Sequence, residues 1–205
     1  MALKFAVNNS LSAVTSLPTA ISTGSMTLLQ TQTASSSATI DFTSNIDSTY
    51  DSYMFKFYDI HPATNRAIFQ FQSDTGTNTN YNITATTTFF QAYHKENDGG
   101  AGLGYNDSHD DAQSTSFLNL TVQNSNNNDS CASGSLQIFN PSSTTFVKHF
   151  ISRLNIMYEE TGGDEYSYEG YKGGYFNTTT ALTRFRFKYS TGNIDSGVIK
   201  LYGIS

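Results

Sequence analysis

The chain has 205 residues and a formal net charge of −6, from 11 Lys and Arg against 17 Asp and Glu. An acidic chain cannot readily replace the counterions on a phosphate backbone, so this charge balance disfavours nucleic-acid binding. Ser, Thr and Asn supply 26, 27 and 18 residues and aromatic residues make up 14% of the chain, a composition typical of a β protein with enough large side chains for a core.

Residues 1–24 are small, polar and weakly periodic, and we interpret them as an N-terminal arm or first-strand region ahead of a single domain at 25–205. Polar residues follow the first seven positions, so no signal peptide is expected. No apolar stretch approaches the roughly 18–20 residues of a membrane-spanning helix, and no membrane partner is predicted. The single cysteine, Cys131, has no basic residue nearby and is predicted to be an inert thiol.

From residue 25 onward, short segments of alternating apolar and polar residues are separated by turn residues, which is typical of consecutive β-strands. Segment 53–60 is apolar on both faces, which predicts a central strand that ends at His61 and Pro62. Segment 184–189 has the strictest alternation. Further strands are expected at 26–32, 38–42, 66–73, 84–93, 117–122, 136–139, 145–158 and 198–204.

The aromatic residues on the apolar phase of these strands are the predicted core. They are Phe55, Phe57, Phe69, Phe71, Phe185 and Phe187. Roughly ten strands and few helix-period segments predict an all-β fold, a β-sandwich. Long, uneven loops at 96–111 and 124–130 favour a jelly roll over an immunoglobulin fold, which would also require a cysteine pair and a core Trp.

Two segments contain candidate binding residues. Asp107, Asp110 and Asp111 crowd one loop and could hold Ca²⁺, but their spacing does not match an EF-hand, and a solvated loop is the interpretation we favour. The four histidines lie on scattered elements, so neither a metal site nor a cofactor is predicted.

The second segment, 159–174, is rich in Tyr, Gly and acidic residues. Tyrosines give large contact areas at low entropic cost, so they suit a partner surface or a sugar ring. The ligand or interface candidates are Tyr166, Tyr168, Tyr171 and Tyr175. The simplest interpretation of the segment, and the one we place first, is a wide hairpin whose tyrosines cover the edge of the sandwich.

No catalytic motif occurs in the sequence, and no catalytic residue is predicted. A glycosidase carboxylate pair among the acidic neighbours of these tyrosines is the weakest alternative, since sequence does not give the separation it requires. Arg184, Arg186 and Lys188 form an outward row that could meet an acidic partner, form a solvated face, or protect an edge.

The stretch from Gly24 to Ile60, with the following His-Pro-Ala-Thr, and the C-terminal stretch Ser196–Ile204 carry a family resemblance. They resemble structural proteins of tailed bacteriophages, especially marine ones, whose jelly-roll domains decorate the head or tail. The resemblance covers residues 24–73 and 181–205. It implies a virion structural role, often as a trimer, and transfers no functional residues.

The sequence therefore predicts a non-enzymatic virion protein. We expect a head-surface decoration protein that forms a homotrimer and attaches to the major capsid protein. The alternative is a receptor- or carbohydrate-binding jelly roll of a tail fibre or spike, and a glycan-processing enzyme comes third.

Overall fold

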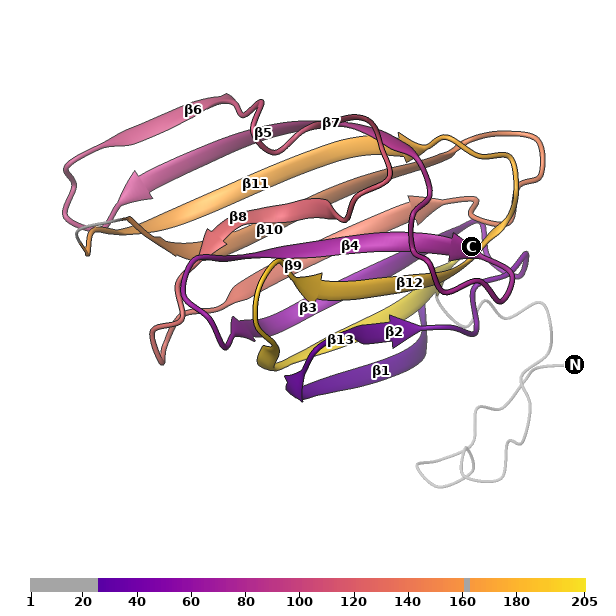
Figure 1. Cartoon of the computed structure of the whole chain (residues 1–205), viewed down its shortest axis with the longest axis horizontal. Coiled ribbons are helices and arrows are strands. Elements are labelled where there is room, and N and C mark those ends of the chain that lie inside the picture. The colour runs from indigo at the N-terminus through magenta and orange to yellow at the C-terminus, as the bar shows by residue number, and fades with distance from the viewer. Residues whose placement is uncertain (1–25, 161–162) are drawn as a thin grey trace, which may run out of the picture.

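The computed structural model describes residues 26–160 and 163–205, which form two antiparallel sheets packed face to face (Figure 1). The large sheet has nine strands in the order β1-β13-β3-β9-β10-β11-β5-β6, with β7 also paired to β5, and the small sheet has the order β2-β12-β4-β8. The strands are β1 (Met26–Ser37), β2 (Ile40–Phe42), β3 (Ser52–Pro62), β4 (Ala67–Thr75), β5 (Ala85–Lys95), β6 (Ala101–Tyr105), β7 (Asp111–Ser114), β8 (Leu118–Asn124), β9 (Ala132–Phe139), β10 (Lys148–Glu159), β11 (Glu165–Phe176), β12 (Leu182–Tyr189) and β13 (Ile194–Ile204).

The predicted all-β sandwich is confirmed, whereas a jelly-roll connectivity specifically stays a prediction. No helix occurs in the described part of the chain, so none there could span a membrane. The predicted arm at 1–24 lies outside the described residues.

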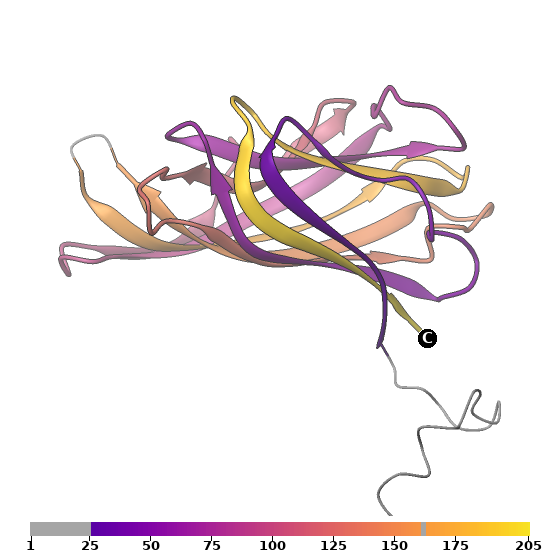
Figure 2. The ribbon, with the colours of Figure 1, turned by 90° about the horizontal axis from the view of Figure 1, so that it is seen from below.

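The core lies between the two layers seen edge-on in Figure 2. All six predicted core phenylalanines are buried there, so the strand phases inferred from the alternation are correct. Phe187 of β12 contacts five other phenylalanine rings, with centroid distances from 5.0 to 6.4 Å. As predicted, β3 is central, since it pairs with β13 and β9.

One loop prediction is wrong, because segment 96–111 contains β6 and the first residue of β7. The wide hairpin considered for segment 159–174 is present, since β10 and β11 pair, but β11 lies between β10 and β5 and not at the edge of the sandwich. Both β6 and β11 are rich in glycine, and their main-chain pairing with β5 compensates for weak local strand propensity. Segment 145–158, predicted as a strand, contains the single strand β10 from Lys148 onward.

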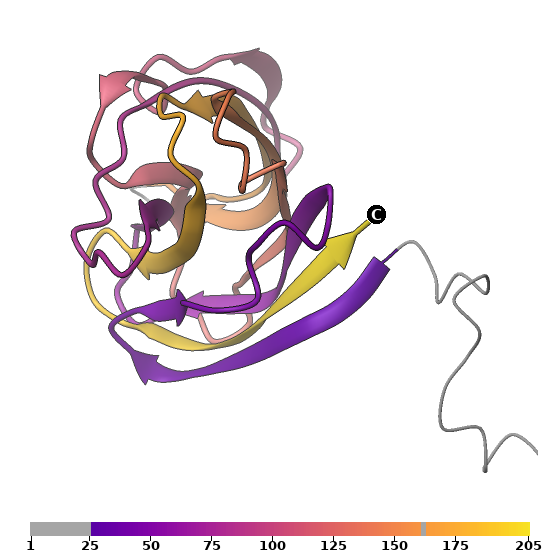
Figure 3. The same ribbon diagram turned by 90° about the vertical axis from the view of Figure 1, so that its right-hand side faces the viewer.

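The unequal widths of the sheets leave part of the large sheet uncovered. Viewed along the long axis, the large sheet curves and the small sheet lies on its concave, inner side (Figure 3). The edge strand β8 packs over β10 and β11, and β5 and β6 extend beyond it. An inner face is therefore open beside β8, and the outer face of the large sheet carries no second layer within the described residues.

Candidate functional site

The four candidate tyrosines do not form one cluster. Side chains alternate along β11, so Tyr166 and Tyr168 face inward and are buried, whereas Tyr171 and Tyr175 face outward. The structure therefore places the candidates on two separate surfaces, one on each face of the large sheet.

On the inner face, two further tyrosines join the buried pair. Tyr93 of β5 stacks on Tyr168 with ring centroids 6.0 Å apart, and Tyr158 of β10 meets Tyr166 edge to face at 5.3 Å. Tyr93 also contacts Tyr166, and Tyr158 also contacts Tyr168. The ring of Tyr93 lies against Gly102 of β6, where an added Cβ would come within 2.8 Å of that ring. Four aromatic rings from three adjacent strands thus share one surface.

These rings line a groove of about 520 Å³, which we call the inner groove. Val122 and Gln123 of β8 form its opposite wall, and Asn106 and His109 of the β6–β7 loop also line it. The groove lies where the inner face extends past the small sheet. Its size falls within the range of small-molecule sites.

At the rim of the groove, one lysine is paired with two carboxylates. Lys95 donates to Asp164 at 2.9 Å and to Glu160 at 3.4 Å, and Glu160 also accepts a hydrogen bond from the Tyr166 hydroxyl. The hydrogen bonds with Tyr166 and Asp164 raise the pKa of Lys95, while those from Tyr166 and Lys95 lower the pKa of Glu160. Lys95 stays protonated and Glu160 stays ionised at neutral pH.

The outer face carries an apolar band made of Phe90, Leu103, Tyr105, Ile151 and Tyr171, which we call the outer band. Phe90 and Tyr171 stack almost in parallel, 4.7 Å apart, yet Phe90 is 45% exposed and Ile151 is 55% exposed. Between them, Gly173 lines a hollow of about 410 Å³. Tyr175 lies apart from this group, against His149.

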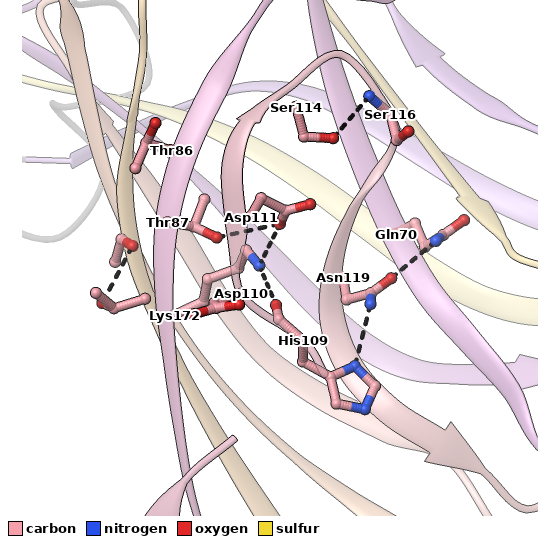
Figure 4. Close-up of polar contacts among 12 residues, drawn as sticks. Gln70, Thr86, Thr87, His109, Asp110, Asp111, Ser114, Ser116, Asn119 and Lys172 are labelled. Atoms are coloured by element: carbon pink, nitrogen blue, oxygen red, sulfur yellow. Dashed lines mark hydrogen bonds and ion pairs between the residues drawn. The ribbon is translucent and has the colours of Figure 1, made fainter. Parts of the chain in front are cut away.

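The acidic loop is held by a lysine (Figure 4). Lys172 of β11 is fully buried and donates to the Asp111 carboxylate at 3.0 Å and to the His109 carbonyl at 2.7 Å. Thr87 donates to the same Asp111 oxygen at 3.1 Å. Asp111 is thus satisfied by an ammonium group from its own chain, and Asp110 accepts a hydrogen bond from the Tyr105 hydroxyl.

Asp107, the third predicted Ca²⁺ candidate, is exposed and makes no polar side-chain contact with the described residues. Within residues 26–160 and 163–205, no three His, Cys, Asp or Glu side chains lie close enough together to hold a metal ion.

His109 is fixed in its neutral form by a chain of amides. Gln70 donates to the Asn119 carbonyl oxygen at 2.8 Å, which turns the Asn119 NH₂ toward the His109 Nδ1 atom at 3.0 Å (Figure 4). A ring nitrogen that accepts a hydrogen bond carries no proton. Burial, and then the charge of Lys172, lower the pKa of His109, in agreement with this arrangement.

The basic row on β12 faces away from the core, as predicted, but does not lie at an edge, because β12 pairs with β2 and β4. Arg186 pairs with Asp41 through two hydrogen bonds, of 2.8 and 2.6 Å, and covers the Tyr81 ring. Burial raises the pKa of the Cys131 thiol, as suits an unreactive cysteine.

Sequence reasoning missed Gln91, Tyr93, Lys95 and Tyr158 as parts of the groove. Gln91, Tyr93 and Lys95 are spaced by two residues and therefore share one face of a strand. That spacing was the available signal, but the segment was expected to end at residue 93. Comparison with known protein families, curated proteins and solved structures finds no match to the chain.

Proposed function

We propose that the protein is a non-enzymatic structural component of a phage particle, a head-surface decoration protein that associates with copies of itself and with the major capsid protein. The sequence resemblance over residues 24–73 and 181–205 supports a virion role. The observation that carries the self-association is the outer band on the large sheet.

Three features of the large sheet support association. Phe90, Ile151 and their neighbours form a contiguous apolar surface on regular strands. Single exposed apolar residues are common on protein surfaces, but a contiguous apolar surface is typical of an interaction site. The nearby charge of Arg153 is already paired with Glu169, so little uncompensated charge opposes contact there. The strand β1 forms one edge of the sheet, and an open strand edge gains stability when a partner covers it.

A second candidate function is receptor or carbohydrate binding at a tail fibre or spike, and the inner groove is the observation that favours it. The two roles differ in copy number. A decoration protein is present in tens to hundreds of copies per particle, whereas a fibre-tip protein is present in few.

Quantitative mass spectrometry of purified particles, with the major capsid protein as internal standard, tests the proposal. The decoration role predicts a copy number that scales with the capsid lattice. A handful of copies per particle would favour the fibre role, and absence from purified particles would refute both.

A further inference from the structure

The inner groove combines aromatic faces with unused hydroxyl groups. Within the described residues, the hydroxyls of Tyr93 and Tyr158 make no hydrogen bond, although both line the groove. The Tyr168 ring stacks on Tyr93 and contacts Tyr158, and burial raises the pKa of Tyr168 to about 12. A phenol hydroxyl can both donate and accept a hydrogen bond.

Amide groups extend the same chemistry along the groove. Asn106 donates to the Gln91 carbonyl oxygen at 2.6 Å, which leaves the Gln91 NH₂ group without a partner in the described part of the chain. Gln123 lines the opposite wall. A ligand with several hydroxyl groups matches this lining, because amides and phenols satisfy both its donors and its acceptors.

The charges select against an anionic ligand. Lys95 is the lysine that lines the groove, and it is already paired with Glu160 and Asp164. His109 is neutral, since its Nδ1 atom accepts from Asn119. Among the described residues that line the groove, a phosphate or carboxylate would therefore meet no cation outside these ion pairs, and it would face two carboxylates at the rim.

We propose that the inner groove binds a neutral saccharide of one or two sugar units. The apolar face of the sugar packs on the tyrosine rings, and its hydroxyls bond to Tyr93, Tyr158 and Gln91. This inference rests on the second candidate function, which assigns the inner groove to receptor or carbohydrate binding, and names its ligand class; it does not depend on the outer band.

The test uses the full chain and a panel of sugars, measured by saturation-transfer NMR and calorimetry. The panel contains glucose, galactose, mannose, N-acetylglucosamine and their disaccharides, with galacturonic and sialic acids as acidic counterparts. The variants Tyr93→Phe and Tyr158→Phe remove one hydroxyl each and keep the ring. Tyr175→Phe, on the outer face of β11 and apart from both the inner groove and the outer band, is the matched control.

We expect at least one neutral sugar to bind, with affinity reduced about three- to tenfold by each inner-face variant and unchanged by Tyr175→Phe. Three results would overturn the proposal. They are no binding by any neutral sugar, tighter binding of the acidic sugars, or binding that Tyr93→Phe and Tyr158→Phe leave intact.

Discussion

Phe187 has the largest number of aromatic neighbours in the core. It is fully buried on β12, and its ring lies against Phe55 and Phe57 of the large sheet as well as Phe69 and Phe71 of the small one. A ring that joins both layers stabilises the contact between the sheets, so its removal leaves a cavity that neither sheet can fill alone.

Phe187→Ala should lower the free energy of unfolding by about 3–5 kcal/mol, from lost burial and the cavity left behind. Urea denaturation measures this directly. Phe146→Ala is the control, because Phe146 is 69% exposed, and we expect it to stay within about 0.5 kcal/mol of the parent. A loss below about 1 kcal/mol for Phe187→Ala would contradict the assigned strand phase.

His109 makes stability depend on pH. Its pKa is lowered from 6.5, so below that pH the unfolded chain binds protons more readily than the folded one. The free energy of unfolding should therefore fall as the pH drops below 6.5, by at most about 1.4 kcal/mol per pH unit from this group.

Comparing the parent with His109→Gln at about pH 7.5 and 5.0 isolates this contribution, because the carboxylates titrate in both proteins. The stability advantage of the parent should shrink at the lower pH. An advantage that stays constant with pH would show that His109 does not titrate differently on folding.

At the scale of strands, the sequence predicted the elements whose large apolar residues either alternate along the strand or occupy both of its faces. β12 and β4 alternate because the core covers one face of each, and β3 is apolar on both faces as a central strand. No strand was assigned to the residues of β6 and β11 because glycines replace many of the large residues that mark a strand, although each forms a hairpin with the strand before it, β5 and β10 respectively.

The missed β11 also explains why the site was predicted only in part. Tyr166, Tyr168, Tyr171 and Tyr175 were recognised as a binding set, but no strand boundaries were assigned within their segment, so the alternation that divides them between two faces was not applied. The groove also requires Tyr158 and Gln123, whose proximity depends on the pairing of β10 with β11 and the packing of β8.

Two N-terminal truncations, of different length, test where the predicted arm ends and the folded domain begins. Deleting Met1–Ser22 should keep the unfolding temperature within a few degrees of the parent, because Phe5 is the one aromatic residue among them, and should abolish incorporation into particles. Deleting residues 1–37 removes β1 and uncovers the edge of β13, so this protein should unfold at a lower temperature and aggregate.

Circular dichroism during heating measures the unfolding temperature of each truncated protein, and an incorporation assay measures how much of it enters particles. If the shorter deletion unfolds the protein, residues 1–22 belong to the fold. If the shortened protein still enters particles, attachment depends on the sandwich or its loops.

For the whole molecule, the outer band predicts self-association. Light scattering on the full chain should give a mass three times the 22.5 kDa of one chain, as the resemblance to trimeric virion proteins implies. Ile151→Glu places a charge in the band and should yield monomers, whereas Asn155→Glu, exposed on the same face of β10, should not. A monomeric parent, or a trimer that tolerates Ile151→Glu, would exclude the band as the interface.

A cryo-electron microscopy reconstruction of the particle tests the central claim, a structural role on the phage head, most directly. The account predicts copies of the two-sheet domain at symmetric sites on the head surface, with the outer face of the large sheet against a neighbouring copy. Density for the domain only at the tip of a tail fibre, or no density in the particle at all, would contradict it.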